Sequence, residues 1–95
     1  MGNEVTIVLT SRERELILQY GYPFDNIKRQ LRKSSRSRRP VKISDGPYWW
    51  EQVVGNLSIS VNEDVEDRDL AQELCDLADA VEWNLELHKR RTGGR

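Results

Sequence analysis

The segment EVTIVLTSRERELI, residues 4–17, places a strand pattern directly before a helix-start signal. Val5, Ile7 and Leu9 alternate with side chains directed to the other face, which is the period-two pattern of a β-strand with one buried side. Thr10 and Glu13 fit a capping box, in which a threonine hydroxyl and a glutamate carboxylate each accept a hydrogen bond from a free backbone N–H. We therefore predict a strand that ends at residue 10 and passes at once into a helix.

This first helix is expected to run to about Tyr20 and to stop at Gly21 and Pro23, which are residue types typical of helix ends. Its apolar side chains, Leu16, Ile17 and Tyr20, are predicted to be buried. A second short helix should begin near Phe24 or Asp25, because Phe24, Ile27 and Leu31 follow one another at helical spacing. Pro40 marks the latest point at which this second helix can end.

The second half of the chain repeats the order of strand and helices. PVKIS, residues 40–44, predicts a second short strand with Val41 and Ile43 on one face. Pro47 suits the first turn of the helix that follows. The apolar stripe of this helix consists of Trp50, Val53, Val54, Leu57 and Val61. Gly55 weakens this helix relative to alanine, and we expect it to permit the close approach of another element.

A long terminal helix is predicted from about Asp64 to Arg91. Its apolar stripe consists of Leu70, Leu74, Leu77, Val81 and Leu85. Two helices lie between the predicted strands, so the chain reverses three times and the strands run antiparallel. The expected fold class is α+β with the order β-α-α-β-α-α, mostly helical, with a short two-stranded antiparallel ribbon and a long C-terminal helix.

The 95 residues correspond to one small domain, 1–95, with a modest core. Residues 1–3 and 92–95 are expected to be disordered, and the basic segment 32–40 is expected to be a mobile loop. No stretch approaches the roughly 20 apolar residues that cross a bilayer, so we expect no membrane partner. A single cysteine and the lack of a signal-peptide pattern favour a cytoplasmic location.

No catalytic or metal-binding constellation is present in the sequence. Cys75 is the only cysteine and His88 the only histidine, whereas a zinc site needs three or four such ligands and acyl transfer needs a nucleophile beside a base. Cys75 lies next to the terminal stripe and is expected to be a half-buried small apolar residue. We predict that the protein is not an enzyme and has no catalytic residues, metal or cofactor.

The stretch KRQLRKSSRSRRPVK, residues 28–42, is basic and contains no acid, although the net charge of the chain is −1. Its cations are Lys28, Arg29, Arg32, Lys33, Arg36, Arg38, Arg39 and Lys42. Residues 63–86 contain ten acids. Two interpretations are open. In the first, the basic stretch faces the acidic helix or is simply solvated. In the second, it binds the phosphates of a nucleic acid. The first interpretation is the more common meaning of such charge runs.

Tyr48, Trp49 and Trp50 occupy adjacent helix positions, which span about 200° of arc and cannot all face one core. Trp50 fits the buried stripe, so Tyr48 and Trp49, together with Trp83, are candidate partner-binding residues. The favoured partner is a second copy of the chain, in a homodimer, or another protein. Stacking on nucleic-acid bases is the alternative, because aromatic rings beside basic segments are typical of single-strand binding.

Two resemblances bear on function. LTSRERELI, Leu9–Ile17, resembles the opening of the response-regulator type of helix-turn-helix, and the likeness extends over residues 9–39. It implies a recognition helix containing Ser34, Ser37 and Arg39. The sequence departs from that pattern at Lys28, where the family has a small residue, and at Lys33 and Arg38, where it has apolar anchors. Pro40 would also shorten the recognition helix, so these departures argue against a docked DNA-reading helix.

The overall layout also resembles small uncharacterised bacterial α+β proteins with a strand, a capped T-x-x-E-x helix and a terminal L-x-x-E-L-x-x-L helix. The terminal motif is formed here by Leu70, Glu73, Leu74 and Leu77. This resemblance implies a bacterial cytosolic module and no particular activity. The sequence thus predicts a small non-enzymatic protein-interaction or regulatory module that self-associates; the alternative is a nucleic-acid-binding protein that uses residues 28–42.

Overall fold

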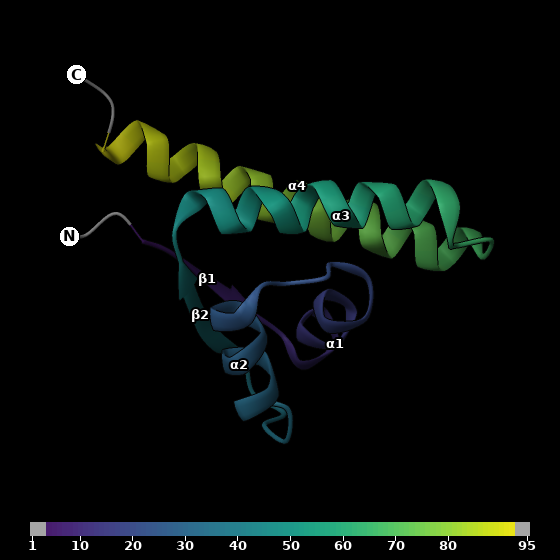
Figure 1. Ribbon diagram of the computed structural model, residues 1–95, viewed down its shortest axis with the longest axis horizontal. Helices are drawn as coiled ribbons and strands as arrows, with labels where there is room; N and C mark the ends of the chain where they lie inside the picture. Colours follow the sequence, from purple (N-terminus) through teal and green to yellow (C-terminus); the bar gives the residue numbers. More distant parts are fainter. Residues whose placement is uncertain (1–3, 93–95) are drawn as a thin grey trace.

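A computed structural model describes residues 4–92, which form two strands and four helices (Figure 1). Their order is β1 (Val5–Leu9), α1 (Ser11–Tyr20), α2 (Asp25–Lys33), β2 (Val41–Asp45), α3 (Pro47–Glu63) and α4 (Arg68–Thr92). The predicted α+β class, the element order and the long C-terminal helix are confirmed. The expectation of disorder at residues 1–3 and 93–95 falls outside the described residues, and Thr92 is the last residue of α4.

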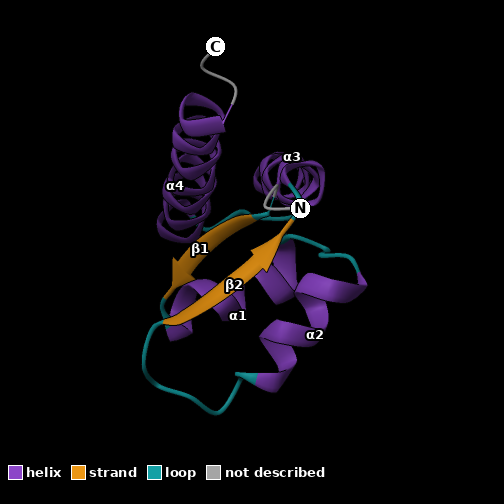
Figure 2. Cartoon of the chain, turned by 90° about the vertical axis from the view of Figure 1, so that its left-hand side faces the viewer, coloured by secondary structure: helices purple, strands orange, loops and turns teal. Residues whose placement is uncertain are grey.

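The two strands form the predicted antiparallel ribbon, with Val5 opposite Asp45 and Leu9 opposite Val41. Figure 2 shows this ribbon between two helix pairs, α3 and α4 on one side and α1 and α2 on the other. Val5, Ile7, Leu9 and Ile43 point into the core, whereas Thr6, Val8 and Lys42 are exposed on the outer face. A two-stranded ribbon is marginal in water alone, so the helices that cover its inner face stabilise it.

Side chains bond to backbone groups at the ends and edges of the strands. The capping box predicted after β1 is present: Glu13 N donates to Thr10 Oγ1 at 3.1 Å, and Thr10 N donates to Glu13 Oε1 at 2.9 Å. Gln30 uses both groups of its amide on β2, because Ser44 N donates to Gln30 Oε1 and Gln30 Nε2 donates to Ser44 O. The capping box satisfies N–H groups at the start of α1, and the Gln30 bonds satisfy groups that the open edge of β2 would leave unpaired.

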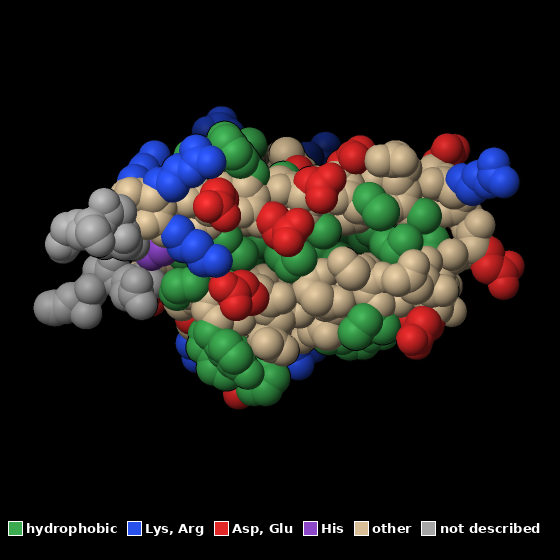
Figure 3. All heavy atoms as spheres, turned by 90° about the horizontal axis from the view of Figure 1, so that it is seen from above, with side chains coloured by type: hydrophobic (Ala, Val, Ile, Leu, Met, Phe, Trp, Pro, Cys, Tyr) green, Lys and Arg blue, Asp and Glu red, His purple; other side chains and the backbone are tan. Residues whose placement is uncertain are grey.

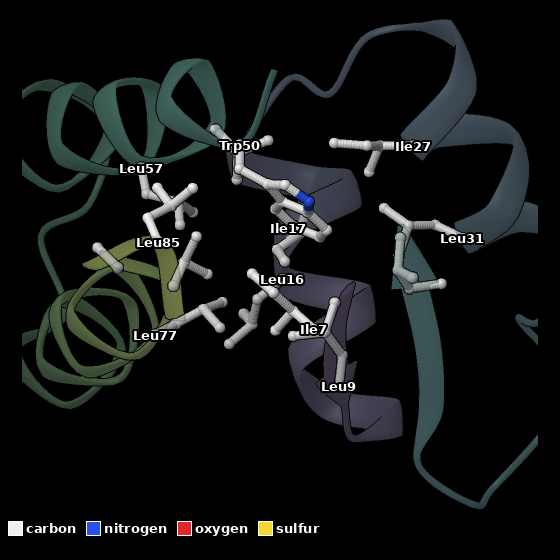
Figure 4. Close-up of a cluster of buried hydrophobic side chains, with 14 of the residues drawn as sticks. Ile7, Leu9, Leu16, Ile17, Ile27, Leu31, Trp50, Leu57, Leu77 and Leu85 are labelled. Carbon is white, nitrogen blue, oxygen red and sulfur yellow. The ribbon is translucent and has the colours of Figure 1, made fainter. Parts of the chain in front are cut away.

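The core lies where the ribbon meets all four helices. In Figure 4, Trp50 and Ile17 lie between the side chains of α2 on one side and those of α3 and α4 on the other. Trp50 is fully buried, and its indole Nε1 donates to Val5 O at 3.0 Å. The predicted stripes of α3 and α4 supply much of this core, although Val54, Val61 and Leu70 are only half-buried. Tyr20 is also half-buried.

Helices α3 and α4 form a hairpin (Figure 1), and α4 begins at Arg68 rather than near Asp64 as predicted. Asp67 explains the later start, because its Oδ1 accepts hydrogen bonds from the backbone N–H groups of Asp69 and Leu70. This is the bonding of an N-cap residue. None of the helices within residues 4–92 is both long and apolar enough to cross a membrane.

Two expectations about single residues are wrong. A Cβ on Gly55 would have no neighbour within 4 Å, so no element approaches closely there. The close approach of another element is at Gly21 instead, where a Cβ would lie 3.2 Å from Val53 Cγ1 of α3. Cys75 is exposed rather than half-buried. Phe24 is the N-cap residue of α2, at the predicted start of that helix, and its side chain is 60% exposed.

Candidate functional site

The exposed face of α2 carries a group of cations. Ile27 and Leu31 are fully buried, so the helix directs its opposite face to solvent. Asp25, Lys28, Arg29, Arg32 and Lys33 line a shallow hollow of about 700 Å³ on that face, which we call the basic hollow. Four of its five lining residues are cations, so the hollow attracts anions.

The basic stretch continues beyond α2 as a turn, residues 34–40, with Arg36, Arg38 and Arg39 exposed. We call this segment the basic turn. It has no helical residues, so the recognition helix implied by the helix-turn-helix resemblance is not formed there. Lys42, the last cation of the stretch, lies on the outer face of the ribbon opposite Val8 and is separate from the basic hollow.

Arg14 on α1 holds the basic turn in place, a role that is not predicted from the sequence. Its side chain is only 2% exposed. Nη1 donates to Leu9 O at 2.8 Å and to Arg39 O at 3.0 Å, and Nη2 donates to Ser37 O at 2.6 Å and to Ser34 O at 3.3 Å. One buried guanidinium thus joins the end of β1 to three carbonyls of the basic turn.

The Arg14 cation is bonded to backbone carbonyls rather than to acids. Among residues 4–92 no carboxylate forms an ion pair with it, and its Nε atom is buried without a hydrogen-bond partner. Arg14 occupies the position three residues before Ile17 on the buried side of α1. An arginine within an apolar stripe is the sequence signal that could have identified it, because buried cations are rare unless they are bonded.

The acids of α4 do not neutralise the basic stretch. Ion pairs in the described part of the chain join Arg12 to Glu15 and Glu73, and Lys89 to Glu51. α2 packs on β2 and α1, whereas α4 packs on α3 and β1, and Figure 1 shows α2 and α4 on opposite sides of the molecule. The interpretation in which the basic stretch faces the acidic helix is therefore wrong, and the cations are solvated.

Aromatic side chains gather where α2 and α3 begin. The rings of Phe24 and Trp49 are stacked, with centroids 4.7 Å apart and planes at 26°. Tyr48 meets Trp49 edge-on, with centroids 4.7 Å apart and planes at 81°. Trp49 is half-buried, whereas Phe24 and Tyr48 are 60% and 58% exposed. We call Phe24, Tyr48 and Trp49 the aromatic cluster.

Trp83, the third predicted partner-binding residue, is not part of this cluster. It lies on α4, is 55% exposed, and has the Arg90 guanidinium 5.7 Å from its ring centroid. No ring contact within residues 4–92 joins it to Tyr48 or Trp49. Tyr48 and Trp49, two of the three predicted partner-binding residues, therefore lie together in the aromatic cluster with Phe24. Trp83 lies on another surface.

A charged groove runs between α3 and α4. It has a volume of about 420 Å³ and is lined by Glu51, Val54, Gly55, Glu82, Leu85, Glu86 and Lys89. Figure 3 shows acidic and basic side chains along this face, with hydrophobic side chains between the helices. Glu51 and Lys89 are paired at 4.0 Å. Because acids outnumber the one cation that lines it, the groove does not suit an anionic ligand.

Arg12 and Glu73 connect α1 to α4 through a two-point contact. Arg12 Nε donates to Glu73 Oε2 at 3.0 Å, and Nη2 donates to Glu73 Oε1 at 2.9 Å. The hydrogen bonds from Arg12 lower the pKa of Glu73 below its ordinary value of 4.5. The same bonds raise the pKa of Arg12. This pair is exposed and joins α1 to α4, and neither of its residues lines the basic hollow.

Within residues 4–92, no three His, Cys, Asp or Glu side chains are placed to hold a metal ion together. No protein-family model, curated protein or solved structure matches this chain. The basic hollow, the basic turn and the aromatic cluster are therefore interpreted from their geometry and charge.

Proposed function

We propose that the protein binds the phosphates of a nucleic acid with the basic hollow and the basic turn. The residues that carry this role are Lys28, Arg29, Arg32, Lys33, Arg36, Arg38 and Arg39. The observation that supports it most is that these cations share no ion pair with the acids of the described chain and lie on the side opposite α4. Asp25 is the one acid among the residues that line the hollow.

This surface is better suited to contact with the phosphate backbone of a nucleic acid than to recognition of bases in the groove of a duplex. Sequence readout from a duplex needs polar side chains on a rigid element that enters the major groove. The helix of this surface, α2, is short, and the segment after it is a turn. Long flexible cations are instead suited to phosphates, whose contacts release counterions from the nucleic acid. Five such contacts would give log K a slope of about −4.5 against log salt.

Fluorescence anisotropy with a labelled DNA oligonucleotide, titrated at increasing salt, tests the proposal. The triple variant Arg32→Gln, Arg36→Gln, Arg39→Gln should weaken binding and flatten the salt slope by about one unit for each phosphate that the protein no longer neutralises. The matched control, Arg68→Gln, Lys89→Gln, Arg90→Gln, removes the same charge from α4 and should bind like the wild type at physiological salt, where charges on the far side of the molecule are screened. No binding even at low salt, or equal losses in the two variants, would refute the proposal.

Self-association through α4 is the second candidate function, and the exposure of Trp83 favours it. The solvent side of α4 also carries Asp69, Glu73, Asp76, Asp79, Glu82 and Glu86, all exposed. The basic face of a second copy would complement these acids. Because the two faces lie on opposite sides of one chain, such a contact is head-to-tail rather than two-fold symmetric.

Size-exclusion chromatography with light scattering tests this second candidate. Head-to-tail association through opposite charges should appear at low salt and weaken above about 0.1 M salt, where surface charges are screened. Trp83→Ala should reduce it, whereas Ile59→Ala, which removes another exposed apolar side chain, should not. A monomer at low salt and at micromolar concentration would exclude self-association.

A further inference from the structure

The aromatic cluster is already organised in the free chain. Trp49 is half-buried and held between Phe24, stacked on one side, and Tyr48, which meets it edge-on. Rings fixed in this way lose little side-chain freedom when a ligand binds, so their contact with a partner is less costly than that of a mobile side chain. Phe24 and Tyr48 remain more than half exposed and offer ring surface to a flat ligand.

The cluster lies at one end of the basic hollow. Phe24 is the N-cap residue of α2, and its carbonyl accepts the hydrogen bond from the backbone N–H of Lys28 at 2.8 Å. Lys28 itself lines the hollow. From the cluster, the nine residues of α2 extend about 14 Å to the basic turn. One ligand can therefore contact the rings and the cations together.

We infer that the nucleic acid taken by this surface is single-stranded, with a base stacked on the aromatic cluster and the phosphates that follow it lying along α2. This inference rests on the proposed function. In a duplex, the faces of the bases are covered by their neighbours. In a single strand, every base has a free face, and stacking on protein aromatic rings combined with a basic track is the general mode of single-strand binding.

The test compares the affinities of the protein for two labelled oligonucleotides, a single strand of about 15 thymidines and a hairpin duplex with the same number of phosphates. The length of the single strand suits binding sites of about 4–16 nucleotides. The single strand should bind more tightly. The variant Phe24→Leu, Tyr48→Leu should weaken single-strand binding at least about fivefold, the loss expected from one stacked base, and leave duplex binding and the salt slope unchanged. Trp83→Leu is the matched control and should behave like the wild type.

A single strand with abasic sites provides a readout that does not depend on any variant folding. It keeps the phosphates but lacks the bases, so the wild-type protein should bind it as weakly as the double variant binds the intact strand. Equal affinity for abasic and intact strands, or equal affinity for single strand and duplex, would overturn the inference and leave phosphate binding standing. Failure to bind any of these oligonucleotides at low salt would remove the proposed function as well.

Discussion

Arg14 shows how one buried residue supports a surface made of like charges. Basic side chains in the turn repel one another, and a free loop would spread them apart. The Arg14 guanidinium adds a further positive charge, yet it stabilises the turn because it bonds to backbone carbonyls of Ser34, Ser37 and Arg39 and not to side chains. The carbonyl dipoles of the turn therefore point inward, and its arginine side chains remain outside.

Replacing Arg14 with methionine should lower the free energy of unfolding by about 2–4 kcal/mol, because four carbonyls lose a charged donor in a mostly buried position. Urea denaturation followed by circular dichroism measures the loss. Arg12→Met is the matched control: it removes an exposed arginine from the same helix, and its effect should be clearly smaller. Equal losses of stability in the two variants would mean that the buried bonds of Arg14 contribute no more than the exposed interactions of Arg12.

Glu73 gives a prediction about pH. Its pKa in the folded protein is lowered from the ordinary value of 4.5 by the bonds from Arg12, so the folded chain binds this proton less readily than the unfolded chain. The stability that the pair contributes is therefore complete above pH 4.5 and is lost as the pH falls through the lowered pKa.

The variant Glu73→Gln should accordingly show a shallower fall of the urea midpoint on acidification than the wild type. Measurements at several pH values between neutral and acidic conditions supply the two slopes. Asp79→Asn, another exposed acid of α4 to which no arginine is bonded within residues 4–92, is the control and should follow the wild type. Parallel curves for Glu73→Gln and wild type would contradict the prediction.

At the scale of elements, two glycines with different surroundings allow the effect of helix propensity on stability to be measured separately from the effect of packing. Gly55 lies inside α3, and a Cβ there would meet no atom within 4 Å. Gly21 ends α1, and a Cβ there would lie 2.9 Å from Ile17 O and 3.2 Å from Val53 Cγ1. Alanine should therefore suit the first position and clash at the second.

Gly55→Ala is expected to raise the free energy of unfolding by about 0.5–1 kcal/mol, since alanine favours a helix interior and restricts the unfolded chain. Gly21→Ala should lower it, because a Cβ there would press on Ile17 O within α1 and on Val53 Cγ1 of α3, so the end of α1 must distort and also shift relative to α3. Thermal unfolding of the two variants beside the wild type measures both signs. A loss of stability in Gly55→Ala would show that the glycine has a role that its open surroundings do not explain.

The element order and the antiparallel ribbon are predicted correctly, whereas the start of α4 and the surroundings of single residues are not. The strand and cap at residues 5–13 follow from alternation and from Thr10 and Glu13, which act within one segment. The start of α4 is predicted too early because helix periodicity and acidic composition continue through residues 64–67, and Asp67 alone decides where bonding begins. Spacing places Phe24 at the start of α2 correctly, but it cannot reveal that Trp49, distant in sequence, stacks on Phe24.

For the whole molecule, the main property is that its charges are segregated. A net charge of −1 conceals a basic side formed by α2 and the basic turn and an acidic side formed by α4. The sequence reveals both runs but not their relative position, since that depends on how the helix pairs pack on the ribbon. The two candidate functions use the same basic side, so self-association and nucleic-acid binding should compete.

The acids of α4 should also influence nucleic-acid binding from a distance. The variant Asp79→Asn, Glu82→Gln, Glu86→Gln removes negative charge from the opposite side of the molecule and should strengthen oligonucleotide binding at about 10 mM salt, where charges act over roughly 30 Å. At physiological salt the Debye length falls to about 8 Å, and the difference from the wild type should disappear. Anisotropy titrations at the two salt concentrations measure this. A gain that persists at physiological salt would contradict this long-range effect. Either the acids then contact the strand directly, or the substitutions release the basic side from a second copy of the chain. Light scattering of the same samples distinguishes the two, because only the second involves a change in molecular mass.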